Sequence, residues 1–136
     1  MVGLPYETDD LFEETYVLLN SIDFAYLHVF IYSKRKGTIA CEMKHHVKGD
    51  IAKERSKKLH ELEKEKSIKY MKTLIENNIV LYAPSESFCE KTKTASGTSD
   101  RYIKVYFKQS KDEKKTIKRL LPKKIYLDGI YCSGDY

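Results

Sequence analysis

Cysteines, long apolar runs and a leader segment are scarce or missing in this sequence. The three cysteines, Cys41, Cys89 and Cys132, stand far apart and are odd in number, which excludes a disulfide framework. No run of about 18 apolar residues occurs, so no helix is expected to cross a membrane. Nothing at the start resembles a basic-then-apolar secretory leader, and the expected location is therefore the cytoplasm.

The residues that are present predict a folded, basic protein. Hydrophobic residues make up 41% of the 136 residues, too many for a disordered chain. That length fits one domain, or part of one joined to a small second domain. Residues 1–66 carry 11 Lys/Arg against 12 Asp/Glu, whereas residues 67–136 carry 14 against 8, a net charge of +6. Because the positive charge is concentrated in the second half, nucleic acid is the expected partner.

The first half of the chain predicts alternating helix and strand. Thr8 can cap a helix whose first turn is acidic and which ends near residues 20–21. Residues 26–32 are apolar or aromatic on both alternating faces, as is typical of a strand covered on both sides in a parallel α/β sheet. After a polar loop over residues 34–49, a second helix is predicted from residue 50 to about residue 66.

Beyond residue 67 the hydrophobic pattern changes from a helical to an alternating period. Residues 84–99 are rich in Ser and Thr and are expected to form a loop. Several short strands within about 70 residues predict a small antiparallel β-barrel. The predicted strands cover residues 71–75, 79–82 and 101–108 and the two sides of a turn at Asp128-Gly129.

Two stretches resemble one protein family closely. Residues 2–15, VGLPYETDDLFEET, are similar to that family's VGFPGETDEDFEET segment, and residues 26–38, YLHVFIYSKRKGT, to its YLHVFPYSKRPGT segment. The family is that of the radical-SAM methylthiotransferases, which modify tRNA next to the anticodon, and the resemblance is closest to members acting on threonylcarbamoyladenosine. Residues 54–59 continue the similarity into the family's linking helix. Residues 101–107, RYIKVYF, are similar to a strand of its terminal TRAM domain, an RNA-binding β-barrel.

The resemblance implies an α+β chain. It divides the chain into a remnant of the α/β radical-SAM barrel over residues 1–49, a linking helix over 50–67 and a TRAM- or OB-like antiparallel β-barrel over 68–136. The implied function is to bind tRNA, at the anticodon stem-loop, for methylthiolation of the modified adenosine next to the anticodon. Two alternatives stay open: an inert truncated fragment, and a subunit that completes a split enzyme with a separate chain carrying the N-terminal half.

The resemblance also implies iron–sulfur clusters and S-adenosylmethionine as the family's cofactors. The radical-SAM cluster needs thiolates from a CxxxCxxC loop. No two cysteines of this chain are close in sequence. We therefore expect the chain to bind neither cofactor alone and to be inactive by itself; whether it takes part in an enzyme is left open.

The strongest candidate site is the basic and aromatic segment 101–108. On a strand, Tyr102, Lys104 and Tyr106 share one face, while the opposite face is mainly core. Lysines neutralise phosphates and exposed aromatic rings stack on unpaired bases, so these three residues are predicted to contact RNA. The alternative is that this strand only supplies core and solvated surface. Further phosphate contacts are expected from Arg101, Lys108, Lys114, Lys115, Lys118, Arg119, Lys123 and Lys124.

Two weaker candidates lie in the first half. The turn containing Arg35, Gly37 and Thr38 resembles the family loop at the active-site end of the barrel, and its cationic side chains are suited to phosphate. A solvated loop is the favoured interpretation. His28 lies in the predicted buried strand and is interpreted as a core histidine with satisfied hydrogen bonds.

Two other groups of polar residues invite a chemical interpretation. Cys41 with His45 and His46 has metal-binding side chains, but a second ligand pair is missing nearby, so a polar loop is favoured over a zinc site. Glu7 and Asp9 are paired acids near a helix start, where helix capping is favoured over acid–base catalysis.

Overall fold

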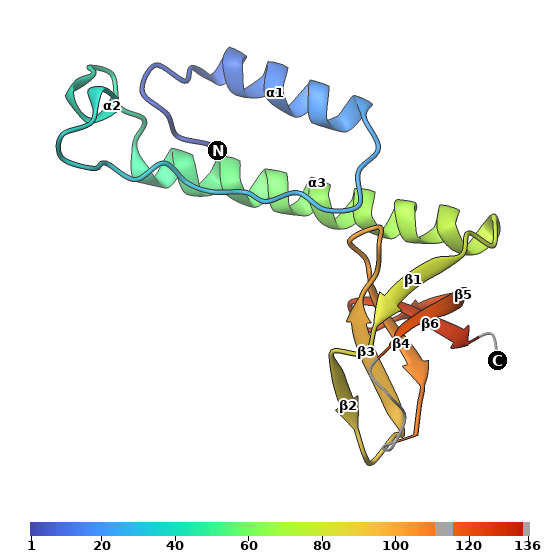
Figure 1. Cartoon of the computed structure of the whole chain (residues 1–136). Helices are drawn as coiled ribbons and strands as arrows, with labels where there is room; N and C mark the ends of the chain where they lie inside the picture. The colour runs from blue at the N-terminus through green and yellow to red at the C-terminus, as the bar shows by residue number, and fades with distance from the viewer. Residues whose placement is uncertain (111–115, 135–136) are drawn as a thin grey trace. The chain divides into compact units, whose positions relative to one another are not determined.

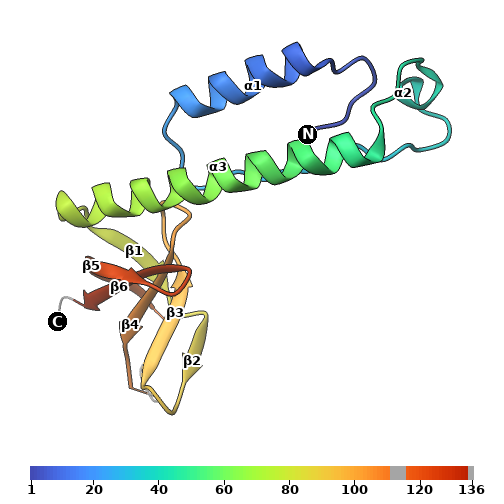
Figure 2. The ribbon, with the colours of Figure 1, turned by 180° about the vertical axis from the view of Figure 1, so that it is seen from behind.

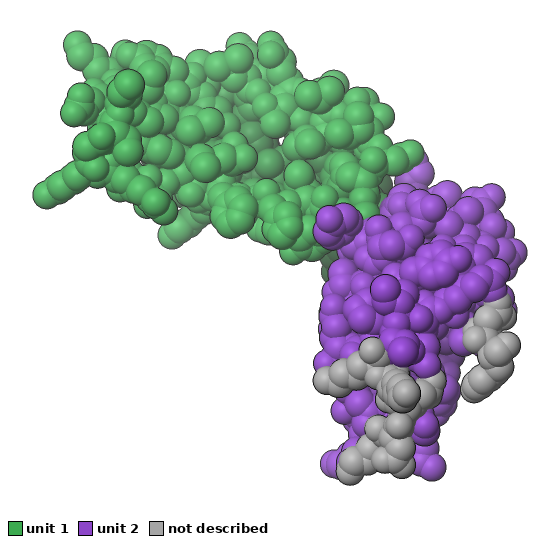
Figure 3. Space-filling model, in the orientation of Figure 1, with its two compact units in different colours: residues 1–66 green, residues 67–136 purple. Residues whose placement is uncertain are grey.

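The computed structural model describes residues 1–110 and 116–134. The chain divides into two compact units, residues 1–66 (unit 1) and residues 67–136 (unit 2), which are coloured separately in Figure 3. None of the helices in the described part of the chain is long and apolar enough to cross a membrane. In chain order the elements in Figure 1 are α1 (Asp9–Ser21), α2 (Ile39–Glu42), α3 (Gly49–Glu76), β1 (Leu81–Pro84), β2 (Ser87–Cys89), β3 (Thr94–Thr98), β4 (Lys104–Lys108), β5 (Ile117–Tyr126) and β6 (Gly129–Gly134).

Unit 1 is built from α1 and the first part of α3, which lie side by side in both ribbon views (Figures 1 and 2). The predicted cap of α1 is confirmed: the Thr8 hydroxyl oxygen accepts a hydrogen bond from the Leu11 N–H at 3.3 Å. One side of α1 faces α3, because Phe12 joins Val2, Leu59 and Leu62 in the unit 1 core and Tyr16 and Leu19 pack against that cluster.

Residues 26–32 do not form the doubly covered strand that the sequence predicts. The segment is extended and bridges to Val2 in parallel: the Val2 N–H donates to the Phe30 carbonyl oxygen, and the Tyr32 N–H donates to the Val2 carbonyl oxygen, both at 2.8 Å. One side of the segment packs against the unit 1 core, but Tyr26 and Phe30 are 56% and 61% exposed. The described part of unit 1 supplies no second layer over that side.

The interpretation of His28 as a core histidine is also wrong, because its side chain is exposed. The alternation of the extended segment places it on the uncovered side. There its ring centroid lies 4.6 Å from that of Tyr26 and 6.3 Å from that of Phe30. The three rings form an exposed aromatic row on unit 1.

Helix α3 continues well past its predicted end, so the predicted strand over residues 71–75 is wrong. Met71 and Leu74, three positions apart, are buried, which is the spacing of a helix face. The helix stops where Asn78 adopts a left-handed backbone with φ of 50°, and the Ile79 N–H donates back to the Leu74 carbonyl oxygen at 3.0 Å. The Asn-Asn pair is therefore a helix C-terminal signal and not a hairpin turn.

Unit 2 contains a curled six-stranded sheet in the order β1-β5-β6-β4-β3-β2. Its neighbouring strands are antiparallel except for β4 and β6, which are parallel. The sheet is thus a mixed half-barrel, compatible with a TRAM- or OB-like domain, where the sequence predicts an entirely antiparallel barrel. Strands β2 and β3 replace the loop predicted over residues 84–99. The β5–β6 hairpin is confirmed, although its turn residues are Leu127 and Asp128, and Gly129 already pairs with Tyr126.

Two glycines permit close approaches between strands. A Cβ on Gly97 of β3 would stand 1.9 Å from the carbonyl oxygen of Pro84 on β1, and a Cβ on Gly129 would stand 2.0 Å from the carbonyl oxygen of Lys104 on β4. Only glycine fits such contacts. The first approach curls the sheet, and the second holds the β5–β6 turn beside β4. The curled sheet encloses a core of Leu81, Ala83, Ala95, Val105, Phe107, Leu120, Ile130 and Cys132.

Candidate nucleic-acid interface

One face of the unit 2 sheet gathers tyrosines from four strands. The register brings them together, because directly paired residues share a face: Tyr106 pairs with Tyr131, and Tyr131 with Lys124. Tyr82 on β1 pairs with Arg119 on β5. Alternation on β4 adds the lysines on either side of its tyrosine. We call the following set the tyrosine face: Tyr82, Lys104, Tyr106, Lys108, Arg119, Lys124, Tyr126 and Tyr131.

The rings and cations of this face contact one another. The ring centroids of Tyr106 and Tyr126 are 5.2 Å apart, and those of Tyr126 and Tyr131 are 6.0 Å apart, both edge to face. Lys104 Nζ lies 5.4 Å from the Tyr106 centroid and Lys124 Nζ lies 5.8 Å from the Tyr131 centroid. These contacts hold the rings of Tyr106, Tyr126 and Tyr131 in place, so this part of the face is ordered before any ligand arrives.

A carboxylate at the β5–β6 turn is bound to this face. Asp128 Oδ2 lies 2.9 Å from Lys104 Nζ, and Asp128 Oδ1 accepts a hydrogen bond from the Tyr106 hydroxyl. The hydrogen bonds from Tyr106 and then Lys104 hold the pKa of Asp128 below its usual range. The hydrogen bond to Asp128 raises the pKa of Lys104. Both groups are therefore charged at neutral pH, and Asp128 acts only as an acceptor.

The prediction that Tyr102 shares a strand face with Lys104 and Tyr106 is wrong, because Arg101 and Tyr102 both precede β4. An RNA contact by either residue stays a prediction. They form a turn before β4, in which the Ser99 hydroxyl accepts from the N–H groups of Arg101 and Ile103 at 3.3 and 3.2 Å. Tyr102 has a positive φ of 58° and is 82% exposed. Because of this turn, the alternation of strand faces begins only at Lys104, the first residue of β4.

The other basic candidates are divided between the two faces. Arg119 lies on the tyrosine face, whereas Lys118 pairs with the buried Ala83 and belongs to the opposite face. Lys123 is exposed at the irregularity between Pro122 and Lys124. The remaining two lysines that the sequence singles out, Lys114 and Lys115, fall outside the described residues.

The sequence analysis missed Tyr82, Tyr126, Tyr131 and Asp128. The sequence predicts a polar lysine loop after residue 108 and a strand only from Ile125, because basic residues and a proline interrupt the pattern over β5. The two buried residues of β5, Leu120 and Pro122, lie two positions apart, but the residue between them, Leu121, is also apolar, so the sequence shows no clear alternation there. Which tyrosines meet depends on strand order, which no local pattern contains.

The turn containing Arg35, Gly37 and Thr38 serves to start α2, so the polar loop predicted there includes a short helix. Gly37 has a positive φ of 81°. The Thr38 hydroxyl donates to the Arg35 carbonyl oxygen at 2.8 Å and accepts from the Cys41 N–H at 3.3 Å. The observed role of Thr38 is therefore that of a helix N-cap.

The described side chains that could bind a metal ion are spread over several elements. One ring nitrogen of His46 contacts the carbonyl oxygen of Cys41 at 3.3 Å. In the described part of the chain, no three His, Cys, Asp or Glu side chains gather as metal ligands. Cys41 is on α2, Cys89 on β2 and Cys132 on β6. This donor set does not fit an iron–sulfur cluster, which takes several thiolates at one place.

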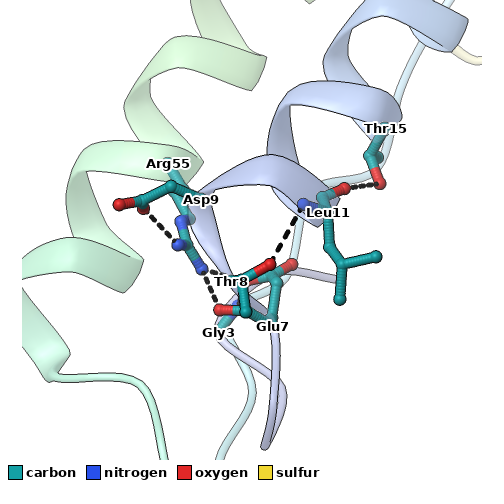
Figure 4. A network of polar contacts seen from close by, with 7 residues as sticks. All are labelled: Gly3, Glu7, Thr8, Asp9, Leu11, Thr15 and Arg55. Atoms are coloured by element: carbon teal, nitrogen blue, oxygen red, sulfur yellow. Dashed lines mark hydrogen bonds and ion pairs between the residues drawn. The ribbon is translucent and has the colours of Figure 1, made fainter.

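Glu7 and Asp9 bind Arg55 of α3 in addition to flanking the helix cap (Figure 4). Arg55 Nη1 lies 2.7 Å from Glu7 Oε2, and Arg55 Nη2 lies 2.6 Å from Asp9 Oδ1. Arg55 is only 5% exposed, and Glu7 Oε2 also accepts from the Gly3 N–H at 2.6 Å. The two acids thus fasten the chain start and α1 to α3, a role that the sequence analysis did not assign.

The cysteines differ in the reactivity that we expect. Burial raises the pKa of the Cys132 thiol to about 12, whereas hydrogen bonding with Thr92 lowers the pKa of the exposed Cys89 thiol. Iodoacetamide at about pH 8 should therefore alkylate Cys89 in the native chain and Cys132 only after unfolding. Peptide mass spectrometry over a time course measures both rates. Equal native rates would contradict the burial of β6.

Known proteins similar to this chain are tRNA-modifying enzymes. The chain is 37% identical to the threonylcarbamoyladenosine tRNA methylthiotransferase MtaB of Bacillus subtilis over 114 residues, covering 82% of this chain and 25% of the relative. It is 38% identical over 112 residues to the tRNA-2-methylthio-N(6)-dimethylallyladenosine synthase of Bacillus velezensis, covering 82% and 22%. The synthase of the same name from Geobacillus kaustophilus is 46% identical over 72 residues, covering 53% and 14%. No protein-family model matches.

The curled sheet with its tyrosine face defines a small α+β unit compatible with a TRAM- or OB-like domain. By sequence, the chain is related to the tRNA methylthiotransferases, and the similarity fits the C-terminal part of that family. The resemblance found in the sequence is thereby confirmed at the level of the family. The chain spans about a quarter, or less, of the length of the curated relatives it matches.

Proposed function

We propose that unit 2 binds RNA through the tyrosine face, and that the chain is the tRNA-binding portion of a tRNA methylthiotransferase. The observation that carries the proposal is the gathering of tyrosine rings and cations from β1, β4, β5 and β6 on one face. Unpaired bases stack on aromatic rings, and Lys and Arg neutralise phosphates beside them. The net charge of +6 on residues 67–136 adds a long-range attraction for RNA.

The RNA that we propose unit 2 binds is the anticodon stem-loop of a tRNA. Its loop presents unstacked bases of the kind that proteins read by stacking and by hydrogen bonds to base edges. The names of two relatives place the methylthio group on a modified adenosine of tRNA. In our proposal this chain binds tRNA and does not carry out the methylthio transfer, because its described side chains do not fit an iron–sulfur cluster site. The cytoplasm is the compartment that fits such a role.

Fluorescence anisotropy with a labelled anticodon stem-loop tests the proposal. We expect weak binding. The logarithm of the binding constant should fall linearly with the logarithm of the salt concentration, with a slope of roughly −0.7 for each phosphate neutralised on a single strand. Lys124→Glu should weaken binding and make that slope shallower. Lys72→Glu, which makes the same charge change on exposed α3, is the matched control. If the chain binds neither the stem-loop nor a duplex at low salt, the proposal is wrong.

A separate observation supports a second candidate function for unit 1, as a subunit that completes a larger enzyme. Besides the aromatic row at residues 26–30, unit 1 exposes Leu11, Val17 and Leu18 of α1 at 49%, 58% and 61%. Exposed apolar groups of this extent mark protein interfaces. The partner in this proposal is a chain with the CxxxCxxC half of a methylthiotransferase.

Co-expression with such a chain distinguishes the two functions. A complete split enzyme should copurify as one complex, and amides near Phe30 should become protected from hydrogen exchange. Binding of the stem-loop by this chain alone, with no copurification, would leave only the RNA-binding function.

A further inference from the structure

We infer that Asp128 reads the base bound at the tyrosine face and selects guanine. The inference rests on the proposed RNA-binding function and goes beyond it, because it names the base and the residue that chooses it. Asp128 stands at the tip of the β5–β6 hairpin, and its side chain is 63% exposed. Tyr126, two residues before it, supplies a ring 37% exposed for stacking.

The carboxylate of Asp128 is fixed in orientation. Each of its two oxygens is held by a different side chain of β4, Oδ2 by Lys104 at 2.9 Å and Oδ1 by the Tyr106 hydroxyl. The close approach of Gly129 to the Lys104 carbonyl oxygen positions the turn beside β4. A carboxylate fixed in this way loses little further freedom when a ligand binds.

The carboxylate of Asp128 can also accept further hydrogen bonds. A carboxylate has about four lone-pair positions, and the described contacts with Lys104 and Tyr106 occupy one on each oxygen. The backbone N–H of Asp128 also interacts with the carboxylate, and because 63% of the side chain is exposed, acceptor capacity remains toward solvent. The group therefore offers two adjacent acceptors and no donor.

The two carboxylate oxygens of Asp128 match the hydrogen-bond donors of one base edge. Guanine places two neighbouring donors, N1–H and the N2 amino group, on its Watson–Crick edge. Adenine and cytosine place one amino group beside a ring-nitrogen acceptor, and uracil places one N–H between two carbonyl oxygens. An ionised carboxylate repels those acceptors, so only guanine satisfies both oxygens.

The phosphate backbone is excluded as the partner of Asp128 itself. The carboxylate repels phosphate and also neutralises Lys104, so phosphate binding falls to the other cations of the face, such as Lys124 and Arg119. Different residues of one surface thus read the base and bind phosphate, so a mutation can remove one of these activities without the other.

The experiment uses the full chain and 11-nucleotide probes, about the reach of one such sheet, made of uridine with a single central G, A, C, U or inosine. We expect G to bind about 5- to 100-fold more tightly than A, C or U, the range for a bidentate base contact. Inosine, which lacks the N2 amino group, should fall between. Asp128→Asn should abolish the preference and raise affinity for all the other probes, because Lys104 is released. Glu76→Gln removes the same charge from exposed α3 and should leave the preference unchanged.

The outcomes separate this inference from the proposed function. Equal binding of all five probes by the native chain overturns the role of Asp128 while RNA binding stands. A guanine preference that survives Asp128→Asn also overturns it, and Asp128 then only positions Lys104 and Tyr106. If no probe binds at low salt, the proposed function fails and this inference fails with it.

Discussion

Replacing Arg55 with alanine should lower the free energy of unfolding of unit 1 by about 3 kcal/mol. The reason is that Glu7, whose side chain is 11% exposed, would keep its charge and lose its main partner. Burial alone would lower the pKa of Arg55, but the hydrogen bonds to Asp9 and Glu7 outweigh it and raise that pKa. The arginine also lies 5.3 Å from the Phe12 ring centroid, a contact that alanine removes.

Hydrogen exchange of the α1 amides measures this loss in unit 1 separately from unit 2. The matched control is Lys58→Ala, which removes the exposed ion pair with Glu54 at 3.8 Å. An exposed pair of this kind contributes at most about 0.5 kcal/mol. If Arg55→Ala costs no more than the control, the Arg55 network does not fasten α1 to α3.

Replacing Tyr126 with alanine should weaken binding of the anticodon stem-loop by about 5- to 150-fold, the loss of one stacked base. Tyr126 is the ring that touches both Tyr106 and Tyr131, so its removal also loosens the ordered face. Tyr126→Phe keeps the ring and should bind almost as the native chain does. Tyr26→Ala removes an equally large exposed ring from unit 1 and should have no effect.

Anisotropy titrations of the four proteins at one salt concentration measure these losses, and circular dichroism checks that each is folded. If Tyr126→Ala binds as tightly as the native chain, the ring only packs the sheet surface. If Tyr126→Phe loses as much affinity for the stem-loop as Tyr126→Ala does, the hydroxyl and not the ring makes the contact.

Local signals in the sequence predicted the starts of α1 and α3 and the β5–β6 hairpin. Thr8 and the acidic first turn of α1 identify a cap whose chemistry is independent of the rest of the fold. The failure at residues 71–75 has a physical cause. A short apolar run fits a strand or a helix equally, and the deciding contact is the burial of Met71 and Leu74 on one helix face.

The candidate site was predicted only in part, because its residues meet through strand order. Lys104, Tyr106 and Lys108 form one alternating segment that is visible in the sequence. Tyr131 joins them through a parallel pairing of β4 with β6, and such long-range pairings leave no local pattern. Tyr102 was misplaced because a turn with a positive φ at a non-glycine residue leaves no signal in a hydrophobic pattern.

Amide chemical shifts of the isotope-labelled full chain, recorded during titration with the anticodon stem-loop, test most directly whether the tyrosine face is where RNA binds. We predict that the largest changes occur at Lys104, Tyr106, Lys124, Tyr126 and Tyr131 and that residues 1–66 change little. Changes concentrated in residues 26–38, or an absence of changes on the tyrosine face while RNA is bound, would contradict the assignment.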